Sequence, residues 1–594
     1  MKTFISGLCM AVLLSAASDS RLSDAAMQGD RDVVRSLLAQ KVDVNAPQGD
    51  GTTALHWAAY KDDVEMAKML LTAGASVKSV TRIGAITPLF MASKNGSAPM
   101  IEILLQAGAD SNATDEHGTT ALMTAAASGS TDAVKMLIDR GADINAKEGT
   151  HGQTALMFAA ALNRDAAIRM LLEHRADPSI TSKPVKLPPP GPRFDDGNPV
   201  PEAKEEKPAA AVPGKESATD QKAALDALAG SLGFKSAVYT AGKSEDGPAD
   251  LKTMVQKLSA KVDEMEKRLP GDKSKGEDGN SMYGIIRERG TLDMGGLTAL
   301  LYAARDGHME AAKALLEGGA NINEVSASEK TSPLVMATMN GHFDLAKLFV
   351  DWGADPNLAN NQGLTALYAA VDLQWAPKGW FPAPGVGQEK TTYLDLMKTL
   401  LGTGANPNAR ITKKLWFRSF GDHSWVDTAG ATAFWRAAQS SDIDAMRLLV
   451  DHGADPDLPT THGTTPLMAA SGIGWGYHYS MNAPDSWMQA VKYCAQHGAD
   501  VNAADDRGYT ALHGAAYLGN HEMIAYLIEK GGDVKAVAKD KNTVADMANG
   551  PTRFGIPHPE TVAMLEKLGS ANSHNCRSDQ CLVAPKEAKK PGDR

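Results

Sequence analysis

The chain has 594 residues, of which 43% are hydrophobic and only 6% are aromatic. This length exceeds what one ordinary hydrophobic core serves, so several domains or a repeat array are expected. The formal net charge of −11 disfavours nucleic acid as a partner, because no basic stripe is present to replace the counterions of phosphate. The strings GxxxxGK(S/T), CxxCH, HExxH and GxSxG do not occur, so these usual sequence signatures of enzymes are missing.

The first 17 residues have the pattern of a secretory signal peptide. Lys2 precedes an apolar run from Phe4 to Leu14, and the small residues 15–17 follow. The run is too short to span a bilayer comfortably, so we expect cleavage near Ala17 and a periplasmic or secreted protein with no membrane contact afterwards. An uncleaved anchor and a helical cap on a cytosolic protein are the alternative interpretations.

A short helix-opening motif recurs along the chain. It begins at residues 53, 87, 120, 154, 298, 332, 365, 432, 465 and 510, with degenerate copies at Ser20 and Thr543. Thr or Ser at its start can N-cap a helix, and Pro at the next position suits a first helical turn. A second amphipathic segment follows, such as 63–74, and ends at a Gly; in several copies this Gly opens a "GAD" string with an Asn after it. The pattern predicts one helix–turn–helix unit per copy.

These strings resemble the ankyrin repeat, whose consensus opens T-P-L-H-x-A and closes around G-A-D-V-N. The resemblance implies an all-α repeat solenoid of stacked helix–turn–helix units with β-hairpin fingers. It predicts about 12 repeats in two blocks, five in residues 18–183 and seven in residues 294–570. Only His56 and His513 keep the motif's histidine, which in the family hydrogen-bonds locally and stiffens the turn. Both are expected to be structural, and the other units to depend more on packing.

Residues 184–293 interrupt the repeats. Residues 184–217 contain nine prolines among Lys, Glu and Ala, which predicts an extended, solvated linker. Apolar residues then recur at spacings of four and three within 251–269, a heptad seam formed by Leu251, Val255, Leu258, Val262, Met265 and Leu269. Self-association through a short coiled coil is one interpretation. A helix that docks on its own solenoid or frays is the other, because three heptads are marginal alone.

Three neighbouring units of the second block are longer than the repeat period. We call residues 374–391, 411–428 and 472–487 the first, second and third aromatic insertions. Long per-repeat insertions often serve a binding face, and Trp and Tyr are frequent at interaction hot spots. The candidate partner-binding residues are therefore Trp375, Trp380, Phe381, Trp416, Phe417, Trp425, Trp475, Tyr477 and Trp487. A private mini-core of these aromatic residues is the alternative.

Their placement follows from ankyrin architecture, in which inter-helix loops and fingers lie on opposite edges. The first and third aromatic insertions should therefore meet more readily than the second. The same region contains a possible acid, base or metal set, namely Asp422, His423, His462, His478 and Asp485. None of these has diagnostic spacing, so no catalytic residue, metal site or cofactor is predicted.

The remaining cysteines suggest two different environments. Cys494 falls on a core-facing position of a repeat helix and is expected to be a buried thiol. In the tail 571–594, Cys576 and Cys581 are close enough in sequence to form a disulfide in an oxidising compartment. A zinc site with His574 would lack a fourth ligand.

Together these features predict a non-enzymatic, exported ankyrin-repeat protein of bacterial type that binds another protein. The expected surface is the helix and finger face of the second block with the aromatic insertions. A carbohydrate- or cell-wall-binding module is one alternative, and it requires flat, solvent-facing Trp and Tyr rings. An accessory subunit of an envelope enzyme is another, and it requires Asp422, His423 or His478 to converge in one pocket.

Overall fold

The structure is a computed structural model that describes residues 19–187, 292–375, 386–413, 415, 426–475, 482–483, 486–551, 555–574, 576 and 578. The chain divides into two compact units, residues 1–189 with 285–594, and residues 190–284. Every described residue belongs to the first unit. The predicted signal peptide and the heptad segment 251–269 lie outside the described residues.

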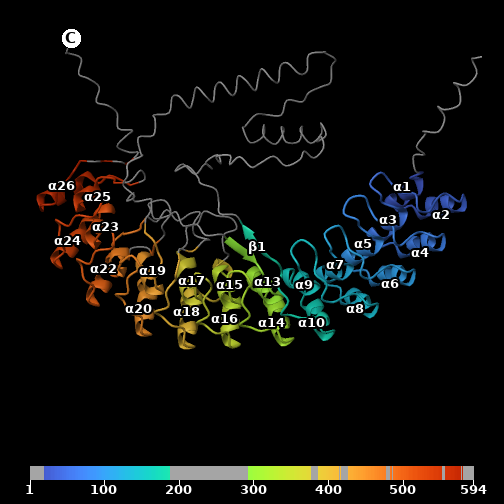
Figure 1. The fold of residues 1–594 in the computed structure, drawn as a ribbon, viewed down its shortest axis with the longest axis horizontal. Helices are drawn as coiled ribbons and strands as arrows, with labels where there is room; N and C mark the ends of the chain where they lie inside the picture. Colours follow the sequence, from blue (N-terminus) through green and yellow to red (C-terminus); the bar gives the residue numbers. More distant parts are fainter. Residues whose placement is uncertain are drawn as a thin grey trace, which may run out of the picture. The chain divides into compact units, whose positions relative to one another are not determined.

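Within the described ranges, 24 α-helices follow one another as consecutive pairs, which lie in two rows (Figure 1). The first helices of the pairs are α1 (Arg21–Gln28), α3 (Ala54–Tyr60), α5 (Pro88–Asn95), α7 (Ala121–Ser128), α9 (Ala155–Ala161), α13 (Ala299–Asp306), α15 (Pro333–Met339), α17 (Ala366–Gln374), α19 (Ala433–Gln439), α21 (Pro466–Ala470), α23 (Ala511–Tyr517) and α25 (Val544–Ala548). The second helices are α2 (Arg31–Ala39), α4 (Val64–Thr72), α6 (Ala98–Gln106), α8 (Thr131–Asp139), α10 (Asp165–Glu173), α14 (Met309–Glu317), α16 (Phe343–Asp351), α18 (Tyr393–Gly402), α20 (Ile443–Asp451), α22 (Trp487–Gln496), α24 (His521–Glu529) and α26 (Pro559–Lys567).

The first helices begin where the sequence places a hydroxyl. The Thr87 hydroxyl accepts the Phe90 amide at 3.1 Å at the start of α5, and Pro88 occupies the next position. The Thr432 hydroxyl accepts the Trp435 amide at 3.1 Å at the start of α19. These bonds satisfy amides that have no partner within the helix, so the motif defines the helix starts by local chemistry.

The core lies between successive pairs. The Leu of the motif is fully buried, as Leu55, Leu89 and Leu122 each show at 1% exposed, and Phe434 takes its place in α19 at 0%. The second helices supply leucines such as Leu70 at the same depth. Cys494 of α22 is 1% exposed and is a free thiol, and burial raises its pKa, as expected of a core cysteine. Each pair therefore buries its apolar side only against its neighbours.

In several units an Asn four residues after the Gly that closes the second helix joins that unit to the next. The Asn112 side chain accepts the Asp143 amide at 2.7 Å and donates to the Gly141 carbonyl at 2.9 Å. Asn357, Asn408 and Asn502 make the same pair of bonds to their following units. These bonds occupy backbone groups at the end of the second helices, where intrahelical partners are absent.

The predicted β-hairpin fingers are formed mostly by turns, which corrects that expectation. Among the described residues, regular strands occur only as β1 (Pro184–Leu187) and β2 (Leu292–Gly295), which pair antiparallel with Val185 opposite Met294. Three other fingers contain a single bridge each, Thr114–Thr120, Arg410–Thr432 and Val537–Thr543. The arms are too short for a ladder, and the fingers instead bond to one another, as the Arg82 amide does to the Asp50 carbonyl at 2.7 Å.

The two predicted repeat blocks belong to one continuous stack. Helices α9 and α13 contact each other, as do α10 and α14. The His308 ring nitrogen Nδ1 lies 3.0 Å from the Ala160 carbonyl oxygen, and the Ala311 amide donates to the Asn163 side chain at 3.1 Å. The described chain ends at β1 before residue 188 and resumes at β2 after residue 291, and these two strands pair within one finger (Figure 1).

In the part of the chain that the structure describes, no helix is both long enough and apolar enough to cross a membrane.

Candidate functional site

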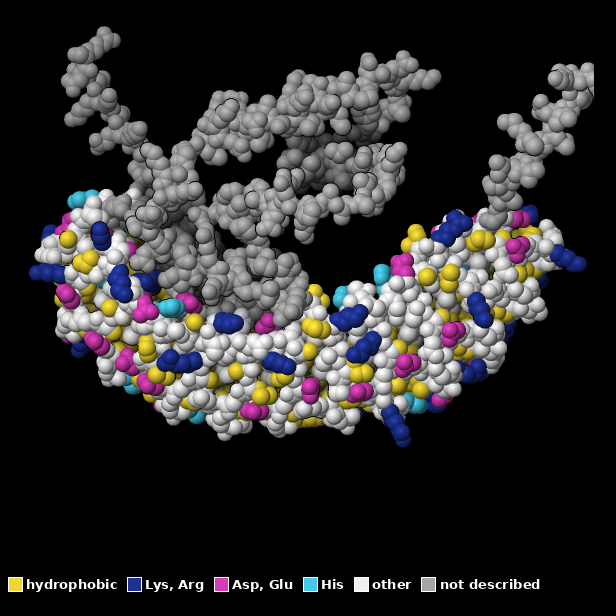
Figure 2. All heavy atoms as spheres, viewed as in Figure 1, with side chains coloured by type: hydrophobic (Ala, Val, Ile, Leu, Met, Phe, Trp, Pro, Cys, Tyr) yellow, Lys and Arg dark blue, Asp and Glu magenta, His cyan; other side chains and the backbone are white. Residues whose placement is uncertain are grey.

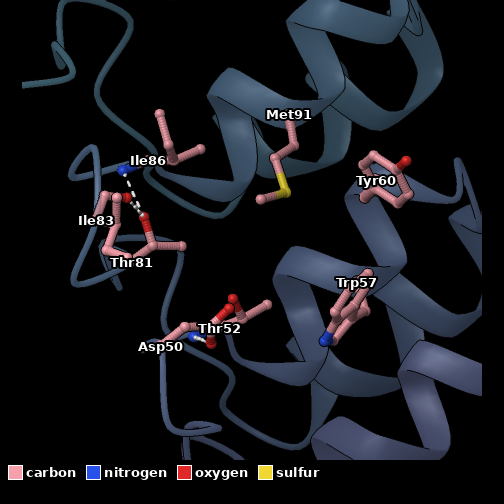
Figure 3. A pocket seen from close by; sticks show the side chains of 8 residues that line it. All are labelled: Asp50, Thr52, Trp57, Tyr60, Thr81, Ile83, Ile86 and Met91. Carbon is pink, nitrogen blue, oxygen red and sulfur yellow. Dashed lines mark hydrogen bonds between the residues drawn. The ribbon is translucent and has the colours of Figure 1, made fainter. Parts of the chain in front are cut away.

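A pocket of about 340 Å³ lies between the second and third helix pairs, on the side of the first helices and the fingers (Figure 3). It is lined by Trp57 and Tyr60 of α3, Met91 of α5, and Asp50, Thr52, Thr81, Ile83 and Ile86 of two consecutive fingers. Most of these side chains are apolar, and they surround a hollow that opens to solvent.

Two rings form one wall of the pocket. The Trp57 indole donates to the Gln48 side chain at 2.8 Å, which fixes the orientation of the ring. Tyr60 meets Trp57 edge to face, with ring centroids 5.8 Å apart. Tyr60 is 56% exposed, so a large aromatic surface stays in contact with water. Figure 2 shows that other hydrophobic side chains reach the surface at scattered places.

The opposite wall is a finger that holds Ile83 in solvent. The Thr81 hydroxyl donates to the Ile83 carbonyl at 2.6 Å and accepts the Ile86 amide at 3.0 Å. These bonds close the finger without using the Ile83 side chain, which is 78% exposed. Exposed aliphatic and aromatic residues on facing walls are typical of an interaction site.

One ionised group stands at the pocket, the carboxylate of Asp50. The Thr52 amide donates to it at 2.9 Å, and this bond and the Thr52 hydroxyl hold the pKa of Asp50 below its usual range. No Lys or Arg among the described residues forms an ion pair with it. The nearby guanidinium of Arg82 instead donates to the Gly49 carbonyl at 2.9 Å.

The side chain at the helix position of Trp57 is also partly exposed to solvent in several later pairs. The fourth residue after the N-cap is Trp57 in α3 and Met91 in α5, and Phe158 and Met336 hold that position in α9 and α15; all four are half-buried. From α17 onward the position closes. Arg436 is 8% exposed there, and a Cβ on Gly514 would lie 2.7 Å from the Ser471 carbonyl oxygen.

Of the nine predicted partner-binding residues, Trp375, Trp475 and Trp487 are described, and each is half-buried. The others lie outside the described residues: Trp380, Phe381, Trp416, Phe417, Trp425 and Tyr477. Whether any of the nine binds a partner therefore stays a prediction. The carbohydrate alternative requires flat, solvent-facing rings, whereas the three described indoles are half-buried.

Trp375 is fixed by a buried polar network in the next helix pair. Its indole donates to the Asp442 carboxylate at 2.7 Å, and its backbone carbonyl accepts from Arg436 at 3.1 Å. Arg436 also pairs with Asp372 of α17 at 2.8 Å. The Tyr393 hydroxyl donates to Asp442 at 2.9 Å, and burial together with this carboxylate raises the Tyr393 pKa. The start of the first aromatic insertion is thus anchored.

The third aromatic insertion reaches the same turn. The Ala483 amide donates to the Ser440 carbonyl at 2.9 Å, two residues from Asp442. Trp475 and Trp487 belong to this insertion, and their rings pack edge to face with centroids 4.7 Å apart. The described residues of the first and third insertions therefore contact one turn between α19 and α20. That the two insertions meet each other stays a prediction.

The two motif histidines are completely buried. The Thr53 amide donates to His56 Nδ1 at 3.1 Å, and Nε2 lies 3.0 Å from the Ile86 carbonyl oxygen of the next unit. His513 accepts the Thr510 amide in the same way at 3.1 Å. Burial lowers the pKa of both, that of His513 to about 4. His56 thus bridges backbone groups of two units, whereas His513 bonds through Nδ1 alone. A buried, neutral imidazole suits a structural role in both units.

Trp435 takes over this bridge in α19, which the sequence pattern did not predict. It occupies the histidine position, and its indole donates to the Thr464 carbonyl at 2.9 Å, the counterpart of Ile86. Met123 and Met468 fill the same position in α7 and α21, and each accepts the amide of its N-cap threonine on sulfur at 3.4 Å. These units therefore replace part of the histidine's hydrogen bonding instead of relying on packing alone.

Of the possible acid, base or metal set, only His462 is described. It lies on a finger, with Nε2 3.4 Å from Asp427 and Nδ1 3.2 Å from Asp506. Asp422, His423, His478 and Asp485 lie outside the described residues. In the tail, Cys576 is described and Cys581 is not, so the predicted disulfide stays a prediction.

The pocket itself escaped the sequence analysis, although a signal was present. The string "TALHWAAY" carries aromatic residues at both of these helix positions, Trp57 and Tyr60, a combination that no other copy of the motif has. Trp57 is half-buried and Tyr60 is exposed, so neither ring is completely enclosed by the packing of its helix.

Comparison with known proteins supports the repeat architecture. Models of ankyrin repeats match residues 22–115, 89–182, 280–360 and 300–376, and further ankyrin models match residues 429–461 and 477–528. Together these matches cover more than half of the chain.

Individual relatives are similar only over short stretches. Palmitoyltransferase ZDHHC13 of Mus musculus is 30% identical over 106 residues, which are 18% of this chain and 17% of that protein. Ankyrin repeat and SOCS box protein 6 of Homo sapiens is 38% identical over 120 residues, 19% of this chain and 26% of that protein. E3 ubiquitin-protein ligase KEG of Arabidopsis thaliana is 35% identical over 89 residues, or 15% and 5%. The matched stretches thus span about a quarter or less of these relatives. The paired helices, their threonine caps and the family matches show that this chain belongs to the ankyrin-repeat proteins.

Proposed function

We propose that the chain is a non-enzymatic, exported scaffold of twelve ankyrin repeats that binds another protein through the pocket at Trp57 and Tyr60. The observation that carries this proposal is the exposure of Tyr60 and Ile83, which stand on opposite walls of the pocket. Water-exposed apolar side chains gathered around a hollow are a recurring feature of protein-binding surfaces. Ankyrin repeats in general offer such preformed surfaces, which is an argument by analogy of fold.

The contacts of the described residues in the aromatic insertions favour the pocket, rather than the insertions, as the binding site. Trp375 donates to a buried carboxylate, and Trp475 and Trp487 pack on each other. Such residues contribute to the stability of their own units. Trp57 is half-buried and Tyr60 is exposed, so both rings keep part of their surface in contact with water, which favours a role in recognition.

Export is supported by the pattern of residues 1–17 alone. Determination of the N-terminal residue of the protein recovered from fractionated source cells tests this point. A new N-terminus near residue 18 in the periplasmic or secreted fraction is expected. An intact Met1 in the cytosolic fraction would contradict export.

The binding face is tested by site-specific photo-crosslinking in the source cell. A photoreactive phenylalanine analogue replaces Tyr60 in one variant and Trp352 in a control variant. Trp352 is 45% exposed at the end of a second helix and does not line the pocket, so it is a matched surface aromatic. A protein crosslinked from position 60 and not from position 352 is expected, and the W57A/Y60A double variant should bind that purified protein at least tenfold more weakly. Crosslinks only from position 352 would place recognition elsewhere.

A further inference from the structure

We propose that the pocket recognises a partner segment carrying a lysine or arginine, whose aliphatic stem lies on Trp57 and Met91 and whose cation meets Asp50. This inference rests on the proposed function and specifies the chemistry of the partner. It follows from three observations. The Asp50 carboxylate is ionised and forms no ion pair with Lys or Arg among the described residues, and apolar walls lie beside it. In another unit of the chain an arginine lies over the ring that corresponds to Trp57, whereas no described cation lies over Trp57 or Tyr60.

The first observation is the unbalanced charge of Asp50. Its carboxylate accepts from the Thr52 amide and hydroxyl, which hold it in the ionised form. Neither bond brings a positive charge, and Arg82 directs its guanidinium to a backbone carbonyl. An apolar partner side chain that covered this carboxylate would remove water from an uncompensated charge, which is costly. A cation avoids that cost, so the site discriminates by charge.

The second observation is the composition of the walls. Trp57, Tyr60, Met91 and Ile83 surround the hollow that Asp50 borders (Figure 3). Lysine and arginine combine an apolar stem with a charged end, and they pack the stem on apolar surface while the charge finds water or a counterion. A pocket with apolar walls and one carboxylate matches both parts of such a side chain.

The third observation comes from α13. There the fourth residue after the N-cap is Tyr302 and the seventh is Arg305, whose guanidinium lies over the Tyr302 ring at 4.8 Å from its centroid. In α3 the same two positions hold Trp57 and Tyr60. No Lys or Arg in the described ranges lies over either ring. The unit at α3 therefore offers aromatic faces without a cation of its own, and a cation over such a face is attracted.

The test is selection of peptides from a random nine-residue library displayed on phage. The bait is the full chain in four forms: unchanged, D50N, W57A/Y60A, and D132N as control. Asn at position 50 keeps an oxygen that accepts from the Thr52 amide but removes the charge. Asp132 is exposed in the first turn of α8, remote from the pocket, so D132N makes the same change in net charge. Circular dichroism confirms that each form is folded.

Peptides that bind the unchanged chain and D132N but not W57A/Y60A depend on the pocket. We expect them to be enriched in Lys or Arg beside an apolar residue, and this enrichment to disappear on D50N. A synthetic selected peptide should bind D50N at least tenfold more weakly, and its Lys-to-norleucine form should lose as much on the unchanged chain. Pocket-dependent peptides without Lys or Arg would overturn this inference and leave the protein-binding function standing. Absence of any pocket-dependent peptide overturns the inference as well, and the crosslinking from position 60 decides separately whether the proposed function fails.

Discussion

The indole nitrogen of Trp375 donates a hydrogen bond to the Asp442 carboxylate at 2.7 Å, and the two residues belong to consecutive helix pairs. The same carboxylate accepts the Tyr393 hydroxyl at 2.9 Å and caps α20 by accepting the Ala445 amide at 3.1 Å. Asp442 is only 2% exposed. One buried carboxylate thus holds the start of the first aromatic insertion, the start of α18 and the start of α20.

Asp442→Asn should therefore destabilise the chain by about 1–3 kcal/mol. The remaining side-chain oxygen can still cap α20, but the new NH2 group would face the Trp375 indole and the Tyr393 hydroxyl, which are donors and need an acceptor. Urea unfolding followed by circular dichroism measures this. Tyr393→Phe removes only one donor and should cost less. An unchanged midpoint for Asp442→Asn would show that the network at Trp375 does not contribute to stability.

The buried ion pair of Arg436 and Asp372 should contribute far more to the free energy of unfolding than an exposed ion pair does. Their side chains are 10% and 8% exposed, whereas those of Arg169 and Glu317, which also join consecutive pairs, are 43% and 48% exposed. Arg436→Ala removes the guanidinium that pairs with the buried Asp372 carboxylate and should cost about 3–5 kcal/mol. Arg169→Ala should change the urea midpoint little, since exposed pairs are screened by water. Equal losses in the two variants would contradict this account.

His513 should make stability depend on pH. Its pKa in the folded chain is about 4, lowered from 6.5 by burial, so the folded state favours the neutral ring. Between about pH 6.5 and 4 the unfolded chain binds a proton that the folded chain does not, so stability from this group is fully present above that window and is lost as the pH falls through it. The loss is at most about 3 kcal/mol.

His513→Asn should remove this contribution, and hydrogen exchange of the α23 amides at pH 7 and pH 4.5 measures it. The difference between the variant and the unchanged chain should depend on pH, since carboxylates and other histidines are common to both. His117→Asn is the control, because the His117 side chain is 63% exposed. The same pH dependence in both comparisons would exclude His513 as its source.

A cut within residues 188–291 should not separate the two halves of the stack. A protease site inserted between Gly214 and Lys215 provides a defined cut. The fragments should elute together in size-exclusion chromatography, because β1 pairs with β2 and α9 and α10 pack on α13 and α14. Mixing separately expressed residues 18–214 and 215–594 tests reassembly. Fragments that elute apart after the cut would show that these contacts are too weak to hold the stack.

The sequence predicted those features that depend on a few neighbouring residues. Helix starts follow from Thr or Ser as N-cap, helix ends from Gly, and the Asn after several of the "GAD" strings marks the turn that the structure places there. The roles of His56 and Cys494 followed from their positions in the motif, since burial of these positions repeats with the period. Such signals lie within one unit, so they can be read without knowledge of the fold.

Only the tertiary structure decided which aromatic residues are buried and which meet solvent. Trp375 stands in a loop and is held by Asp442 of the next unit, Trp435 replaces a histidine by bonding to Thr464, and Tyr60 lies in a repeat helix yet is exposed. The continuity of the stack across residues 188–291 was equally hidden, because β1 and β2 are joined by hydrogen bonds between residues distant in sequence. The physical reason is common to these cases: in a repeat stack each side chain's surroundings come largely from the neighbouring unit, and the sequence of one unit does not specify them.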